Sequence, residues 1–149
     1  MLGARSILTS AGYLLDTNAL SEPVRRTPAP AVTAFMASIS EDETFLSVMT
    51  IGELRKGAAM RQRTDDRHAA RIDTWIDSLE ERYVQRILPI DLEIVDVWGR
   101  LSAARPRPII DTLLAATAIV HKLTLVTRNI SDFADTGAAL VNPWTAKLR

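Results

Sequence analysis

The sequence predicts an α/β fold in which a central parallel sheet of four to five strands carries helices on both faces. Short apolar segments of strand length alternate with longer segments whose apolar residues recur at helical spacing. This alternation indicates parallel strands, because each parallel connection is a crossover long enough to hold a helix. No internal repeat or shift in composition divides the chain, so we expect a single domain over residues 13–149.

The composition is that of an ordinary globular domain and excludes several kinds of function. The chain has 149 residues, of which 47% are hydrophobic and 24% charged, enough for one buried core. It has no cysteine, which excludes disulfides, thiolate catalysis and cysteine-bound zinc. The formal net charge is zero, so the charge balance gives no argument for general nucleic-acid binding. No apolar run reaches the length of a membrane span, and we expect a cytoplasmic protein.

Residues 1–12 are expected to form a flexible leader, or to reflect an upstream start site. Their apolar patch is too short for a signal peptide. The first strand is predicted at 13–15, where three apolar residues run into Asp16, and a short helical turn follows as far as Glu22. The carboxyl ends of parallel strands are where ligands bind, so Asp16 is placed for chemistry, although an aspartate there serves equally well as a helix cap.

The remaining elements follow from apolar spacing and from turn residues. Proline-rich or polar breaks are expected at 25–30, 61–66 and 105–108, and an acidic turn at 41–43. The predicted helices cover 31–39, 50–60, 66–82, 91–104 and 109–122. The predicted strands cover 44–48, 84–89, 123–127 and 138–141. A loop or short turn is expected at 128–133.

Four acidic residues fall at corresponding positions of these elements, and we call them the acidic quartet. One ends the first strand, two lie in the first turn of a predicted helix and one follows the strand at 123–127: Asp16, Glu53, Asp111 and Asp132. Strand ends and the helix starts that follow them share one edge of a parallel sheet. Each acid alone has a structural alternative as a helix cap or dipole partner, and for Glu53 this is a capping box with Thr50.

Four carboxylates at one edge repel one another, and their pKa values rise unless a cation compensates. Oxygen ligands favour hard ions such as Mg²⁺ or Mn²⁺. The two histidines of the chain, His68 and His121, fit no ligand set with the acids. Such a pocket suits phosphoryl transfer, because a metal ion lowers the pKa of water and stabilises charge on a scissile phosphate.

Four segments, taken in chain order, resemble the motifs of a PIN-domain ribonuclease: 14–18, 51–57, 110–118 and 127–133. More closely they resemble the VapC-type toxins of bacterial type II toxin–antitoxin pairs, and the similarity extends from Tyr13 to Trp144. The resemblance implies a PIN-like domain that cleaves RNA endonucleolytically with Mg²⁺ or Mn²⁺. It also implies a homodimer, a cognate antitoxin that blocks the active site, a toxin–antitoxin hetero-oligomer and no membrane partner.

Carried over position by position, the resemblance assigns the acidic quartet as catalytic and metal-binding. It implies attack of a metal-activated water on a phosphodiester, which leaves a 5′-phosphate and a 3′-hydroxyl. Asn18 is expected to support Asp16, while Thr127 and Asn129 are expected to orient metal-bound water or Asp132. The helices between residues 31 and 60 are expected to form the dimer and antitoxin surface.

Cations near these motifs are candidates for holding RNA. They are Arg25, Arg26, Arg55, Lys56 and Arg128. Ordinary surface charge is the alternative for each of them. DNA and RNA cannot be told apart from these residues, since contacts to a 2′-hydroxyl leave no short motif.

Two other classes of function stay open at this point. A catalytically silent PIN-fold module that binds RNA or protein would lack one or more of the quartet acids, and all four are present. Another Mg²⁺-dependent phosphoryl-transfer enzyme is the second alternative. A phosphatase with an aspartyl intermediate would want a second aspartate two residues after Asp16, where Asn18 stands.

Overall fold

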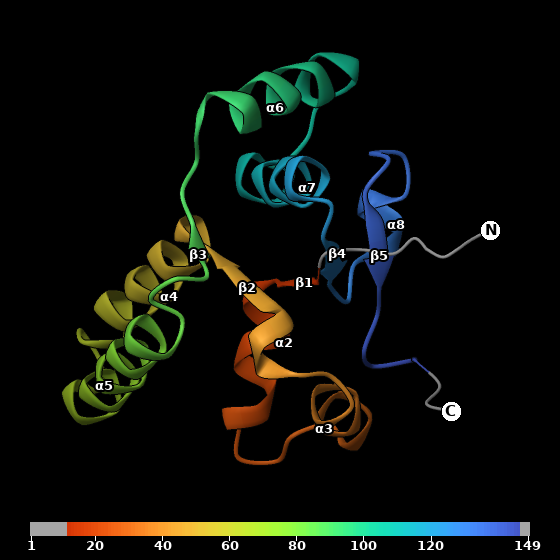
Figure 1. Ribbon diagram of the computed structural model, residues 1–149. Helices are drawn as coiled ribbons and strands as arrows, with labels where there is room; N and C mark the ends of the chain where they lie inside the picture. The colour runs from red at the N-terminus through yellow and green to blue at the C-terminus, as the bar shows by residue number, and fades with distance from the viewer. Residues whose placement is uncertain (1–11, 147–149) are drawn as a thin grey trace.

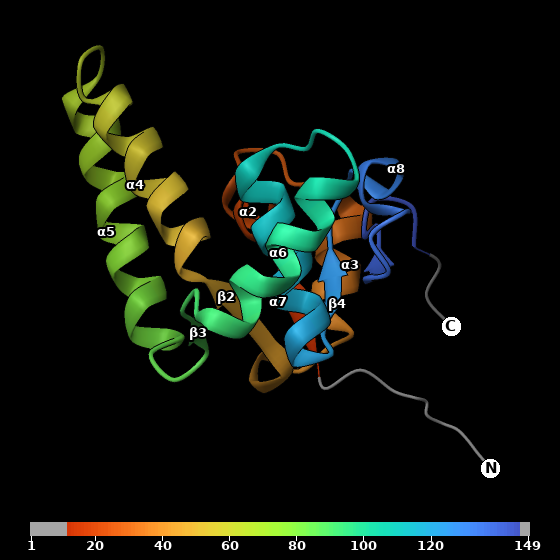
Figure 2. The ribbon, with the colours of Figure 1, turned by 90° about the horizontal axis from the view of Figure 1, so that it is seen from above.

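The structure, a computed structural model, describes residues 12–146 and has a five-stranded sheet at its centre. The strand order is β3-β2-β1-β4-β5 and every pairing is parallel. Helices cover both faces of the sheet (Figures 1 and 2). The predicted α/β fold is therefore confirmed. The leader expected over residues 1–12 lies outside the described residues, apart from Gly12.

Every predicted helix and strand is present, with shifted ends. The strands are β1 Tyr13–Leu15, β2 Thr44–Ser47, β3 Ile87–Leu88, β4 Thr124–Val126 and β5 Ala139–Val141. The longer helices are α3 Pro30–Ala37, α4 Val48–Arg61, α5 Asp66–Arg82, α6 Leu92–Ala104 and α7 Ile109–His121. Two short helices are α2 Thr17–Ser21 and α8 Ile130–Phe133, and 3-10 turns cover Glu22–Val24 and Glu41–Glu43. The segment expected as a loop or turn at 128–133 thus contains α8.

Strand β1 is the middle of the sheet and divides the core in two. Leu14 and Leu15 are both fully buried, and successive side chains of a strand point to opposite faces. Leu15 packs in the cluster that joins the sheet to α2, α3, α4 and α5. Leu14 packs against α7, whose buried Ala115 and Ala118 let the helix lie close to the sheet. Strands buried on both faces are continuous apolar runs, which is the pattern seen in β1.

Helix α6 lies outside α7 rather than on the sheet (Figure 1). It is held there by a separate small cluster of Ile94, Leu113 and Ala116. On the other side, α4 and α5 form a long antiparallel pair that extends away from the sheet (Figure 2). Within residues 12–146, no helix combines the length and the apolarity needed to span a bilayer.

Gly12 already belongs to the packed part of the chain. Its carbonyl accepts a hydrogen bond from the amide of Thr124 at 2.9 Å, which continues the pairing of β1 with β4. Its φ is +143°, and a Cβ atom at this position would lie 2.4 Å from the carbonyl oxygen of Glu43. Only glycine fits a backbone of this conformation at so close an approach.

Candidate active site

Asp16 stands at the carboxyl end of β1 and is 8% exposed. Its amide donates to the carbonyl of Val126 at 3.1 Å, and its Oδ1 accepts from the amide of Ala19 at 2.7 Å. The aspartate therefore caps α2 and also sits at the ligand-binding edge, so the two interpretations are compatible. Burial is the main cause that raises the pKa of the Asp16 carboxyl. Hydrogen bonds from the Ala19 amide and the Thr127 side chain oppose this rise, and the charge of Glu53 adds to it.

Glu53 reaches the same edge from the second turn of α4, not the first. The helix begins at Val48, because the hydroxyl of Ser47 accepts from the amide of Met49 at 3.0 Å and caps it. The capping box that the sequence offered for Glu53 is therefore wrong. Instead, Oε1 of Glu53 accepts a hydrogen bond from the hydroxyl of Thr17 at 2.9 Å. This contact joins Glu53 to the residue that follows Asp16.

Asp111 and Asp132 face a shared cavity of about 130 Å³. Asp111 is half-buried in the first turn of α7, and Asp132 is exposed in α8. Burial is the main cause that raises the pKa of the Asp111 carboxyl, followed by the charges of Glu53, Asp16 and Asp132. All three other members of the quartet are thus close enough to Asp111 to disfavour its ionised form. The predicted rise in pKa is found for Asp16 and Asp111.

No basic side chain within residues 12–146 forms an ion pair with the quartet, although the charge of Arg105 interacts with that of Asp132. Across residues 12–146, every ion pair that the arginines form is with an acid outside the quartet. In the same part of the chain, no group of three or more acidic or histidine side chains lies close enough together to hold a metal ion as a cage. Mg²⁺ does not need such a cage, because it keeps several waters and binds through one or two carboxylates. The oxygen-only donor set therefore fits a hard, partly hydrated cation.

Thr127 is the most buried of the supporting polar residues. Its hydroxyl accepts from the amide of Asn129 at 3.1 Å, and its side chain acts on the carboxyl of Asp16. The structure thus links Thr127 to Asp16, whereas the sequence suggested Asp132 or a metal-bound water. Asn18 acts on Asp16 through its backbone amide. The side chains of Asn18 and Asn129 are exposed, so their expected roles stay predictions.

Two of the candidate RNA-binding arginines line the same cavity as Glu53. Arg25 and Arg26 line a cavity of about 540 Å³ that also includes Thr17 and Glu53. Lys56 is exposed on α4, and the guanidinium of Arg128 lies 4.8 Å from the ring centre of Trp144.

Arg55 does not join this group. It follows Glu53 by two residues, which places it roughly 200° further round the helix. Its guanidinium contacts three carboxylates of α5, at 3.0, 2.7 and 3.1 Å: Asp73, Asp77 and Glu80. These contacts raise the pKa of Arg55, and the hydrogen bond to Asp77 is the largest cause. The expectation that Arg55 holds RNA at the site is therefore not supported by its position.

Several residues near the edge escaped the sequence interpretation. Glu22 is only 4% exposed, and the amide of Ala29 at 2.8 Å is the main cause that lowers the pKa of its carboxyl, with Arg25 adding to it. Arg105 and Arg107 line the cavity of Asp111 and Asp132. The one signal for them in the sequence is that they alternate with prolines directly before the helix of Asp111.

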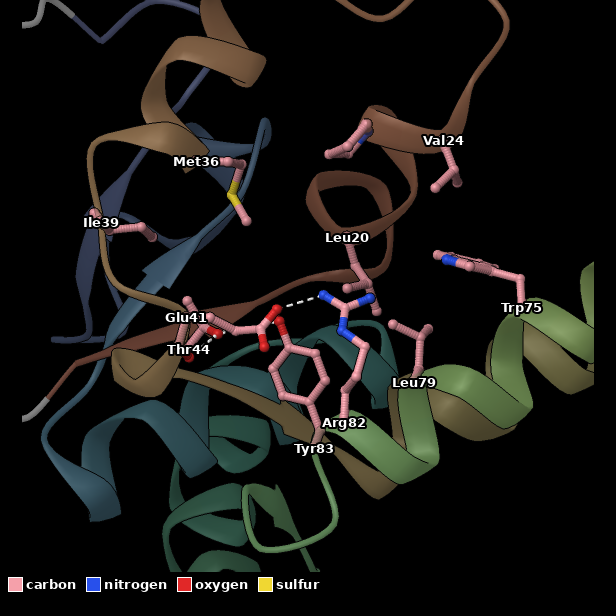
Figure 3. A pocket seen from close by; sticks show the side chains of 11 residues that line it. Leu20, Val24, Met36, Ile39, Glu41, Thr44, Trp75, Leu79, Arg82 and Tyr83 are labelled. Atoms are coloured by element: carbon pink, nitrogen blue, oxygen red, sulfur yellow. Dashed lines mark hydrogen bonds and ion pairs between the residues drawn. The ribbon is translucent and has the colours of Figure 1, made fainter.

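A third cavity, mainly apolar, lies away from the acidic quartet, between α2, α3 and the end of α5 (Figure 3). It measures about 290 Å³ and is lined by Leu20, Met36, Leu79 and neighbours, with the Glu41–Arg82 ion pair on its wall. No member of the quartet lines it. It is therefore not the place of the chemistry, although Val24 and Trp75 line both this cavity and the one beside Glu53.

The sheet topology, with acidic residues at the carboxyl ends of its strands, is that of a PIN domain. The chain belongs to the PIN-domain family, whose signature matches residues 13–138. Among its relatives is toxin FitB of Neisseria gonorrhoeae, 31% identical over 88% of this chain and 97% of that protein. Another is VapC ribonuclease Y4jK of Sinorhizobium fredii, also 31% identical, over 88% of this chain and 96% of that protein.

A solved structure supports the same assignment. The crystal structure of FitAcB from Neisseria gonorrhoeae matches with a TM-score of 0.82 and 30% identity, over 90% of this chain and 99% of that one. The resemblance to PIN-domain toxins that the motifs indicated is therefore confirmed.

Proposed function

We propose that this protein is a Mg²⁺- or Mn²⁺-dependent endoribonuclease and the toxin of a type II toxin–antitoxin pair. The observation that carries the proposal is the charge at the acidic edge. Burial is the main cause that raises the pKa of Asp111, the charges of the other three quartet acids add to it, and no arginine or lysine within residues 12–146 forms an ion pair with any of the four. A divalent cation is the natural compensation. The relatives named as a toxin and as a VapC ribonuclease support the rest.

The division of labour follows from burial. Asp16 and Asp111, the more buried acids, would hold the cation directly, and Glu53 and Asp132 would hold it directly or through water. The bound ion supplies Lewis acidity, which lowers the pKa of a water and offsets charge on the scissile phosphate. Glu53, fixed through Oε1 by Thr17, takes the proton of the attacking water. The new bond forms between the water oxygen and phosphorus, and the bond to the 3′-oxygen breaks in line.

The products of this reaction are a 5′-phosphate and a 3′-hydroxyl, whose proton comes from solvent. Arg25 and Arg26 would hold backbone phosphates beside Glu53, since all three line one cavity. Lys56 and Arg128 are further candidates on the rim. Asn18 and Asn129 keep the supporting roles that the family resemblance implies, and Thr127 supports Asp16.

The proposal includes a protein partner. As a toxin, the chain would be held inactive by a cognate antitoxin and would form a homodimer. The apolar cavity in Figure 3, with Val24 58% exposed beside it, offers a contact surface for an apolar segment of the antitoxin. Val24→Asp should weaken co-purification with the antitoxin by at least about tenfold, with circular dichroism as the check on the fold.

The test of the nuclease function is RNA cleavage by purified wild type, Asp16→Asn and Asp111→Asn, with Mg²⁺ and with EDTA. Both variants should cleave at least about 100-fold more slowly, and EDTA should abolish wild-type cleavage. Asp77→Asn is the matched control, because Asp77 is an exposed acid paired with Arg55, and it should cleave like wild type. Circular dichroism checks the fold. Cleavage by Asp16→Asn at the wild-type rate, or wild-type protein inert on total RNA, would overturn the proposal.

A further inference from the structure

Two arginines and one aspartate form a closed cluster beside the cavity of Asp111 and Asp132. The carboxylate of Asp135 accepts from Nε and Nη2 of Arg105 at 2.8 and 3.2 Å. It also accepts from Nη1 and Nη2 of Arg107 at 3.0 and 3.1 Å. Each arginine therefore holds Asp135 through two bonds, the geometry that gives charged pairs their specificity. These bonds lower the pKa of the Asp135 carboxyl.

The cluster joins three segments that are far apart in the sequence. Nε of Arg107 donates to the carbonyl of Leu101 in the last turn of α6, at 2.8 Å. Both arginines lie in the break before α7, the helix that carries Asp111. Asp135 lies just after α8, and Nη2 of Arg105 reaches the carbonyl of Asp132 itself at 3.4 Å. The cluster thus spans from the start of the Asp111 helix to the backbone of Asp132.

Helix α8 has little else to fix it. It has four residues, and no side chain caps its N-terminus. A single turn of helix is marginal without tertiary contacts. Phe133 anchors it in the core at 3% exposure, but Asp132 is exposed. The position of Asp132 in the cavity that it shares with Asp111 therefore depends on contacts made by the neighbouring backbone.

Most of the hydrogen bonds of the two arginines are made within the protein. All three nitrogens of Arg107 are engaged, one by Leu101 and two by Asp135, and its side chain is only 5% exposed. The three nitrogens of Arg105 are engaged by Asp135, Pro106 and Asp132. An incoming anion would have to displace the buried contacts of Arg107, and it would compete with Asp135 for the bidentate face of Arg105. The geometry therefore favours a positioning role over a substrate subsite.

We propose that the Arg105–Asp135–Arg107 cluster is a positioning element that holds Asp132 across the cavity from Asp111 and so sets the affinity of the acidic edge for its divalent cation. The inference rests on the proposed metal-dependent function. Groups that orient metal ligands typically change metal affinity about tenfold or more when removed. The expected signature is weaker metal binding with a retained maximal rate.

The experiment compares full-length wild type, Asp135→Asn and the control Asp77→Asn, which also removes one carboxylate from an arginine cluster. Mn²⁺ binding is titrated by electron paramagnetic resonance. Asp135→Asn should bind Mn²⁺ about tenfold more weakly, and Asp77→Asn like wild type. Amide hydrogen exchange of α8 in metal-free protein should be faster in Asp135→Asn only. Cleavage at saturating Mg²⁺ should return to within about twofold of wild type.

Arg105→Lys provides a second variant that keeps the charge but loses the two-bond geometry, and it should shift Mn²⁺ affinity in the same direction. Unchanged Mn²⁺ affinity and unchanged exchange of α8 in both variants would overturn the positioning role. So would a loss of rate that saturating Mg²⁺ does not restore. Asp111→Asn, measured in parallel, separates the two proposals. If it binds Mn²⁺ like wild type, the metal assignment itself fails.

Discussion

Two groups of acidic side chains in this molecule have similar composition and opposite electrostatics. On the α4–α5 pair, Asp73, Asp77 and Glu80 surround the guanidinium of Arg55 at 3.1 Å or less. At the carboxyl end of the sheet, the acidic quartet forms no ion pair within residues 12–146, and the pKa values of Asp16 and Asp111 are raised. The first group has a counter-ion within the protein, whereas the second group has no ion-pair partner among the described residues.

The difference gives a way to distinguish a structural acidic cluster from one that is suited to binding a ligand. A cluster with its own counter-ion contributes to stability and needs nothing from solution. A cluster without one costs stability, and that cost is tolerated where a ligand supplies the missing charge. The number of acids is therefore less informative than the presence of a compensating cation. Changes on either side of this contrast should have opposite consequences.

The largest effect is expected for added metal. Mg²⁺ at about 100 times its Kd should raise the free energy of unfolding of wild type by about 2.7 kcal/mol, because it binds the folded state. Asp111→Asn should lose most of this gain, whereas Arg55→Gln should keep it. Thermal and urea unfolding with and without Mg²⁺ measure the effect. Equal stabilisation of wild type and Asp111→Asn would break the contrast between the two clusters.

An intermediate effect is expected when the counter-ion is removed from the other cluster. Arg55→Gln leaves three carboxylates of α5 without their partner and should lower the free energy of unfolding by about 1–2 kcal/mol, a modest value because the acids are exposed. Cleavage by the folded variant should stay within about twofold of wild type. Lys56→Gln, on the same helix with no ion pair in the described structure, is the control. If the folded Arg55→Gln variant cleaves RNA more than about twofold more slowly than wild type, Arg55 becomes an RNA-binding candidate again.

The smallest effect concerns pH in metal-free protein. The folded state binds the proton of Asp111 more tightly than the unfolded chain, since its pKa is raised above the ordinary value of 3.8. Wild-type stability should therefore fall, relative to Asp111→Asn, as pH rises from about 4 toward 7. The difference should be small, because Asp111 is only half-buried. Urea unfolding of both proteins at pH 4, 5.5 and 7 measures it, and a difference of opposite sign would contradict the pKa direction.

Much of this fold could be predicted because local signals agreed with it. Apolar runs marked the buried strands, and the order of acids relative to strand ends and helix starts indicated one edge. The boundary between β2 and α4 was predicted less accurately. Ser47 caps α4, so this helix starts two residues earlier than expected, and Glu53 lies one turn deeper than a cap. Local spacing alone does not decide which of two neighbouring polar residues caps a helix.

The contacts that the sequence did not reveal are all between distant segments. Arg55 was assigned by its nearness to Glu53 along the chain, but a helix turns residues two apart to opposite sides. Its partners lie 18 to 25 residues later. Asp135 meets Arg105 and Arg107 from 28 to 30 residues away. Such pairings depend on how elements pack, and no local pattern encodes them.

The central place of β1 has a consequence for protein synthesis. This first strand pairs with β2, about 30 residues later, and with β4, which follows more than 100 residues later along the chain. During translation, the backbone of Asp16 therefore has no Val126 to bond until nearly the whole polypeptide has emerged from the ribosome. A nascent chain shorter than this cannot assemble the acidic edge, so any activity that depends on this edge begins only when synthesis is almost complete.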